Sequence, residues 1–112
     1  MKKDPLVFLK HILDATELIE EFIKDYTKKR FLEDKLVQSA VIRQIEIIGE
    51  AAKNIPASFR KNYPKIPWVD IVGMRDKLIH LYFGVDLERV WLVITEDIPI
   101  LSRQIQEILQ RE

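Results

Sequence analysis

The sequence contains no cysteine and only two histidines, His11 and His80. Without cysteine the chain forms no disulfide bonds and offers neither a thiol nucleophile nor a thiolate metal ligand. Two histidines distant in sequence do not make a compact set of metal ligands, so we expect no metal and no cofactor. The absence of disulfides is compatible with a reducing compartment, and we expect the protein to be cytoplasmic.

An excess of charge of one sign is also missing, because Lys plus Arg and Asp plus Glu each number 18. A chain with a formal net charge of zero has no global positive field, so any nucleic-acid binding must come from a local patch. Long apolar runs are absent as well. The apolar stretch after Pro5 is interrupted by Lys10, His11 and Asp14, and we expect neither a signal peptide nor a membrane span.

The 112 residues are 47% hydrophobic and 32% charged, a composition typical of one compact helical domain, which we expect over residues 1–112. Apolar residues at spacings of three and four predict four main helices. These cover residues 5–27, 33–54, 67–84 and 87–109, with a kink at Pro99 and one short helix in the 55–66 connection. No strand pattern is visible. The prediction is an all-α, up-and-down bundle of four main helices.

Several residues mark the ends and contacts of these helices. Asp4 and Asp86 are predicted N-caps, and Gly84 is a predicted left-handed cap at the end of the third helix. The small-residue run that begins at Gly49 is predicted to let another helix approach closely.

Arg75 lies in the third predicted helix, within an arc that is otherwise apolar. On a helical wheel of about 100° per residue, Leu78 falls on one side of Arg75 and Ile79 on the other. A guanidinium in such an arc is unfavourable unless an anion or carbonyl groups pair with it. Glu50, in the small-residue run, is the expected partner within the chain. The alternative is that Arg75 pairs with a phosphate group that the protein binds.

Asp76 and His80 are four residues apart, so on a continuous helix the carboxylate would orient the imidazole and raise its basicity. Arg75 and His80 are separated by about 140° on the ideal wheel, a gap that a phosphodiester is large enough to bridge. An arginine for phosphate charge and a histidine for proton transfer, without a compact metal-ligand set, suggest metal-independent cleavage of RNA. The ribose 2′-hydroxyl would then be the nucleophile.

These residues also carry a resemblance to a known family. The elements that match are Pro67-Trp68, Gly73-Met74-Arg75-Asp76, His80, Tyr82-Phe83, Val85-Asp86, Val90-Trp91 and Asp97-Ile98-Pro99. In this order they resemble the HEPN superfamily and, within it, the HepT-like toxins, whose signature R-x-x-x-x-H-x-Y is complete here. With the Gly49-Glu50-Ala51 element upstream, the similarity extends over nearly the whole chain.

The resemblance implies a HEPN-like fold and a homodimeric, metal-independent ribonuclease that acts as the toxin of a toxin–antitoxin pair. It implies that Arg75 and His80 are the catalytic pair in a cleft between two copies, with Asp76 as the adjacent supporting group. The implied substrate is RNA, with tRNA as one candidate. The implied partner is a nucleotidyltransferase antitoxin of the MntA type, which would attach AMP to Tyr82.

Two other functions remain open from the residues alone. The chain could be a non-catalytic helical module that partners a nucleotidyltransferase and binds nucleotide or phosphate through Arg75. It could also be a structural dimer in which Arg75 pairs with Glu50 and His80 is an ordinary surface residue.

Overall fold

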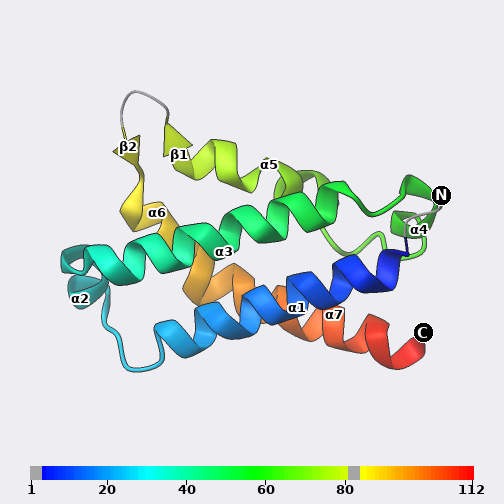
Figure 1. Ribbon diagram of the computed structural model, residues 1–112, viewed down its shortest axis with the longest axis horizontal. Helices are drawn as coiled ribbons and strands as arrows, with labels where there is room; N and C mark the ends of the chain where they lie inside the picture. The colour runs from blue at the N-terminus through cyan, green and yellow to red at the C-terminus, as the bar shows by residue number, and fades with distance from the viewer. Residues whose placement is uncertain (1–3, 81–83) are drawn as a thin grey trace.

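The long helical stretches of the chain run in alternate directions along the long axis of the molecule (Figure 1). The computed structural model describes residues 4–80 and 84–112, and for Ile79 and His80 it describes the backbone alone. The elements are α1 (Pro5–Phe22), α2 (Lys28–Glu33), α3 (Lys35–Lys53), α4 (Ala57–Arg60), α5 (Trp68–Leu78), β1 (Ile79–His80), β2 (Gly84–Val85), α6 (Leu87–Leu92), the π-helix η1 (Val93–Asp97) and α7 (Ile98–Arg111). The predicted all-α, up-and-down architecture is confirmed, including the short helix α4 in the 55–66 connection.

The helix starts follow local capping chemistry. The Asp4 carboxylate accepts a hydrogen bond from the Leu6 amide at the start of α1, and the Asp86 carboxylate accepts one from the Arg89 amide at the start of α6. Both residues satisfy amide groups that have no partner within the helix. Both predicted N-caps are therefore confirmed.

The first two predicted helices have different boundaries in the structure. The first was expected to reach residue 27, but α1 ends at Phe22. Thr27 instead caps α2 by accepting a hydrogen bond from the Arg30 amide, and Asp34 caps α3 in the same way through the Val37 amide. Two N-cap residues seven positions apart divide the region into a short helix and a long one.

The core lies where α1 packs against α3 and α7, and α3 packs against α5. The fully buried side chains with the largest volumes are Phe31, Leu9, Ile12, Ile19, Ile45, Ile48, Ile55, Leu78, Ile94, Ile98, Ile105 and Val41. Gly49 of α3 faces α5, and a Cβ atom added to it would lie 3.6 Å from the carbonyl oxygens of Ile71 and Val72. The predicted close approach of a second helix at Gly49 is confirmed.

The third helix is shorter than predicted, because α5 ends at Leu78 rather than near Gly84. The chain then forms an antiparallel hairpin in which Ile79 pairs with Val85 and His80 with Gly84. Gly84 has a φ of +82°, a conformation that glycine adopts without strain. The left-handed glycine was correctly predicted, but it belongs to β2 and not to a helix cap. The expectation of no strands is wrong at this position.

The fourth predicted helix is interrupted, although not as a simple proline kink. Between α6 and α7 the chain forms one wider π-helical turn, and Pro99 follows in the first turn of α7. Proline has no amide hydrogen, so the carbonyl four residues earlier, on Thr95, loses its usual helical partner. The wider turn occupies the stretch that contains this residue.

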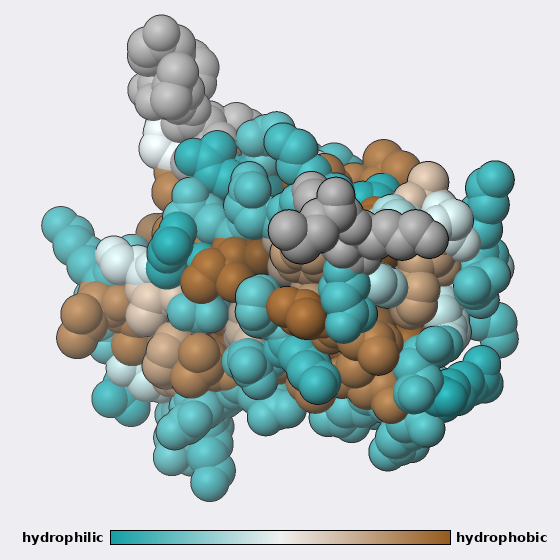
Figure 2. All heavy atoms as spheres, turned by 45° about the vertical axis from the view of Figure 1, so that its right-hand side comes forward, coloured by the Kyte–Doolittle hydropathy of each residue, from teal (hydrophilic) through white to brown (hydrophobic). Residues whose placement is uncertain are grey.

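Apolar side chains reach the surface only in separate areas among hydrophilic ones on the face shown in Figure 2. The large exposed apolar residues of the described ranges are Val7, Leu18, Leu36, Val69, Leu92 and Ile100. They are distributed over five helices. In the described part of the chain, no helix combines the length and apolar character needed to cross a bilayer.

Candidate functional site

Arg75 is on the surface of the monomer and is paired. Its Nε lies 2.9 Å from Oε2 of Glu46 on α3, and the side chains of Arg75 and Glu46 are 49% and 29% exposed. Within the monomer, Arg75 is therefore not buried as its apolar arc suggested, and the prediction that Glu50 is its partner is wrong. Glu46 is one helical turn before Glu50.

Arg75 is exposed because α5 lies at the edge of the bundle. On one side α5 packs against α3, and on the other it meets α6 only briefly. The apolar arc of α5 is therefore covered over only part of its length. The buried residues of this helix are Trp68, Ile71 and Leu78. At Arg75 the nearest neighbour is a polar side chain of α3, and the long arginine stem carries the guanidinium into solvent.

The electrostatic environment of Arg75 stabilises its charge. The hydrogen bond to Glu46 and the attraction to the same carboxylate raise the pKa of Arg75 above its ordinary value, and Asp76 adds to the effect. Asp76 is 84% exposed, with Oδ1 3.6 Å from Nη1 of Arg75. Of the predicted site residues, the structure therefore brings Arg75 and Asp76 together.

His80 does not continue the helix that carries Arg75. It lies in β1, two residues after the end of α5, with its backbone opposite Gly84. The predicted helical neighbourhood of Asp76 and His80 is wrong, because that spacing brings side chains together only on a continuous helix. Tyr82, the predicted modification site, lies outside the described residues.

A groove of about 210 Å³ adjoins Glu46 on the side of α1. It is lined by Phe8 and His11 of α1 and by Arg43, Glu46 and Glu50 of α3, among others. The rings of Phe8 and His11 meet edge to face, with centroids 6.1 Å apart. The position of His11 beside this groove was not predicted. The sequence does indicate the α3 side of the groove, because Glu46 and Glu50 are four residues apart and so lie on one face of that helix, but it gives no signal for His11.

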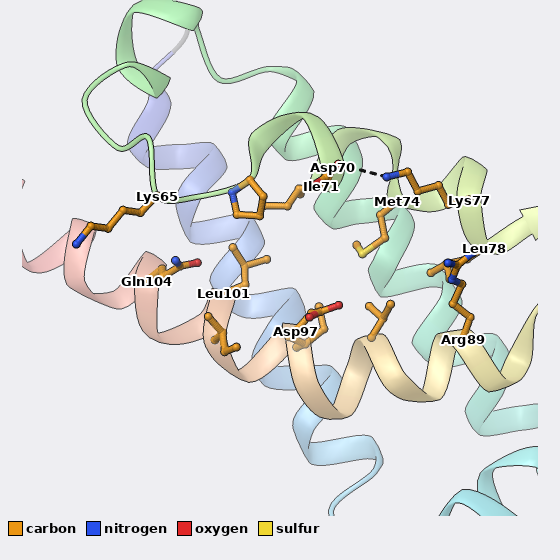
Figure 3. A pocket seen from close by; sticks show the side chains of 14 residues that line it. Lys65, Asp70, Ile71, Met74, Lys77, Leu78, Arg89, Asp97, Leu101 and Gln104 are labelled. Carbon is orange, nitrogen blue, oxygen red and sulfur yellow. Dashed lines mark hydrogen bonds and ion pairs between the residues drawn. The ribbon is translucent and has the colours of Figure 1, made fainter.

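A larger pocket of about 480 Å³ lies between α5 and the segment formed by α6, η1 and α7 (Figure 3). Its apolar floor includes Ile71, Met74 and Leu101, and its rim carries Lys65, Asp70, Lys77, Arg89 and Asp97. Nζ of Lys77 lies 3.2 Å from Oδ1 of Asp70. The rim therefore mixes both signs of charge, and Arg75 is not among the residues that line it.

Metal ligands do not gather at either pocket. Within residues 4–80 and 84–112, no group of three or more His, Asp or Glu side chains could hold a metal ion.

Comparison with known proteins links this chain to ribonucleases. The model of the family described as ribonuclease HepT-like matches residues 12–108. The chain is 49% identical to a protein of Thermococcus cleftensis named probable ribonuclease HepT, over 96% of this chain and 98% of that protein. It is 46% identical to a protein of Caldanaerobacter subterraneus subsp. tengcongensis named as a candidate RNase, over 98% of both chains.

A third relative is longer. The chain is 52% identical, over 98% of its length, to a Methanocaldococcus jannaschii protein named as a gamma-glutamylcyclotransferase and candidate RNase. The match spans 50% of that protein. No solved structure gave a significant match.

Proposed function

We propose that this chain, which belongs to the ribonuclease HepT-like family, is a metal-independent endoribonuclease that acts as the toxin of a toxin–antitoxin pair. The observation that carries the proposal is the family match over residues 12–108, within which the motif Arg75-x-x-x-x-His80-x-Tyr82 is complete.

The proposed reaction is attack of a ribose 2′-hydroxyl on the adjacent phosphorus. The 2′-oxygen loses its proton, the bond from phosphorus to the 5′-oxygen breaks, and the leaving oxygen gains a proton. The products are a 2′,3′-cyclic phosphate and a 5′-hydroxyl. His80 transfers a proton, and Arg75 binds the phosphate and offsets its growing negative charge. Asp76 supports Arg75 from the same helix.

The exposure of Arg75 supports this role by a different route from the one expected from the sequence. A guanidinium that is 49% exposed is accessible to a phosphodiester, whereas a buried one would first have to be uncovered. The site is proposed to lie between two copies of the chain, because a twofold interface brings two Arg75 and His80 pairs together. The substrate is RNA, with tRNA as one candidate.

The proposed partner is a nucleotidyltransferase antitoxin of the MntA type, which silences the enzyme by attaching AMP to Tyr82. A phosphate-bearing group at the motif would add bulk and negative charge where the RNA phosphate binds. Co-expression with such an enzyme should add about 329 Da per AMP to the intact mass. An unmodified mass, together with a Tyr82→Phe protein that is still neutralised, would contradict this part of the proposal.

The test of the catalytic proposal is cleavage of single-stranded RNA in the presence of EDTA. His80→Ala should lower the rate about a hundredfold or more, since it removes the proton-transferring group. His11→Ala is the matched control, because it changes the other histidine of the chain and should leave the rate unchanged. DNA of the same sequence should not be cut.

Three outcomes would contradict the proposed reaction: cleavage that stops when EDTA is added, cleavage that survives His80→Ala, or products without a 2′,3′-cyclic or 3′ phosphate. Binding of RNA or nucleotide that depends on Arg75 but is never followed by cleavage would favour the non-catalytic module.

A further inference from the structure

The ion pair between Glu46 and Arg75 engages one particular edge of the guanidinium. The Glu46 carboxylate accepts its hydrogen bond from Nε, at 2.9 Å. An arginine side chain has five N–H donors, of which one is on Nε and four are on the terminal nitrogens. In the described part of the chain, the only acidic group near the terminal nitrogens is Asp76, whose Oδ1 lies 3.6 Å from Nη1. The fork that binds phosphate through two parallel hydrogen bonds is therefore left largely available.

Packing of the two helices fixes the Glu46 side of this contact. Gly49 is three residues after Glu46 on α3 and lies close to the backbone of α5 at Ile71 and Val72. From there the antiparallel helices bring Glu46 opposite Arg75, about one turn further along α5. Glu46 is 29% exposed, whereas the other acidic neighbour of Arg75, Asp76, is 84% exposed. Glu46 is therefore the more strongly held of the two carboxylates.

We infer that Glu46 is a positioning residue of the ribonuclease site, which holds Arg75 by Nε so that its terminal nitrogens face the scissile phosphate. The inference rests on the proposed function. Holding one edge of the guanidinium reduces the number of side-chain conformations that Arg75 must give up when RNA binds. An arginine that is fixed before substrate arrives also keeps its donors directed at the phosphate during the reaction.

The charge and the hydrogen bond of Glu46 have different consequences. The negative charge of the carboxylate repels a phosphate that approaches the Arg75 guanidinium, while the hydrogen bond orients the guanidinium. Glu46→Gln keeps an oxygen acceptor for Nε and removes the charge, and Glu46→Ala removes both. If the role is positioning, Glu46→Ala should lower kcat about tenfold or more, as expected for a small misplacement of a catalytic group. Glu46→Gln should restore most of kcat and should not raise KM.

The experiment measures kcat and KM for RNA cleavage in EDTA for the wild type, Glu46→Ala and Glu46→Gln. Glu50→Ala is the matched control, because Glu50 is on the same helix one turn further on and is exposed. It should behave as the wild type does. Circular dichroism and thermal unfolding establish that each variant is folded at the assay temperature.

A second readout does not require activity. In the wild type, the Nε–H of Arg75 should give a distinct NMR signal with slowed exchange, because its proton is donated to a carboxylate. The signal should move to that of a solvent-exposed arginine in Glu46→Ala and keep partial protection in Glu46→Gln. Arg75→Ala assigns the signal by removing it.

The outcomes separate this inference from the proposed function. Cleavage that depends on Arg75 but is unchanged or faster in Glu46→Ala would overturn the positioning role alone, and a faster rate would show that Glu46 masks Arg75. A loss of kcat in Glu46→Ala that Glu46→Gln does not restore at all would also overturn it. Wild-type protein that never cuts RNA would overturn the proposed function, and with it the role of Glu46, while the NMR signal would still report the contact.

Discussion

Gly49 offers a quantitative test of how closely α3 and α5 approach. A Cβ atom at this position would lie 3.6 Å from the carbonyl oxygens of Ile71 and Val72, an ordinary van der Waals distance that leaves room for one methyl group. Within a helix, alanine is more favourable than glycine by about 0.8 kcal/mol. Gly49→Ala should therefore raise the free energy of unfolding by about 0.8 kcal/mol, which corresponds to about 3 °C in Tm for a domain of this size.

Two further variants separate helix propensity from the interhelical contact. Gly73→Ala, in α5, adds a Cβ atom with nothing within 4 Å, so it should show the gain from propensity alone. Gly49→Val adds two methyl groups that must press against the α5 backbone, and it should lower the free energy of unfolding by about 1–3 kcal/mol. Urea unfolding followed by circular dichroism measures all three.

A loss of stability in Gly49→Ala alongside a gain in Gly73→Ala would refute this account of the interface. That pattern would mean that the α5 backbone lies closer to Gly49 than the distance of 3.6 Å between the added Cβ atom and the two carbonyl oxygens indicates. A gain in Gly49→Val would refute it from the other direction. Either result would also bear on Glu46, because the spacing of the same two helices sets its distance from Arg75.

Three further perturbations test the core, a buried amide and a titrating cap. Leu9→Ala removes a side chain that is 0% exposed and should lower the free energy of unfolding by about 2–5 kcal/mol; a loss under about 1 kcal/mol in urea would contradict its burial. Gln38→Ala removes a donor that lies 2.8 Å from the Phe31 carbonyl oxygen, which also accepts a hydrogen bond from the Asp34 amide at 3.3 Å, and should cost about 0.5–1.5 kcal/mol by the same measurement, whereas no change would mean that the Gln38 hydrogen bond makes no net contribution to stability. The hydrogen bond from Tyr26 lowers the pKa of Asp34 below its ordinary 3.8, so the stability from this carboxylate is complete above the unfolded-state value and is lost as pH falls through the lowered one. Asp34→Asn should therefore flatten the acid side of a plot of Tm against pH, and an unchanged slope would exclude Asp34 as its origin.

Features set by neighbours in sequence were predictable. Asp4 and Asp86 cap helices as expected, and Gly84 has the expected left-handed conformation, although it lies in a strand and not at the end of a helix. The boundary at Leu78 was not predictable from periodicity. The next residues, Ile79 to Val85, are mostly apolar, β-branched or aromatic, and a short apolar run of this kind suits a helix and a strand equally well.

The partner of Arg75 could not be found because it depends on how two distant helices align. Arg75 and Glu46 are 29 residues apart in sequence, and a shift of one turn along α3 exchanges Glu46 for Glu50. The sequence identified the correct helix through the small residues at Gly49, but not the turn. A helical wheel likewise assumes that an apolar arc is covered along its whole length, and α5 lies at the edge of the bundle.

The hairpin after α5 leaves the helical bundle and returns to it at nearly the same point. The Asp86 amide donates a hydrogen bond to the Leu78 carbonyl at 2.9 Å, just outside the pairing of Ile79 with Val85. Because these contacts tie the two ends of the hairpin together, we expect that insertions between His80 and Gly84 would not alter where α6 begins. An added residue would then leave the bundle intact but would change the spacing between His80 and Gly84. Any limit on that length would come from the chemistry at the motif and not from the stability of the fold.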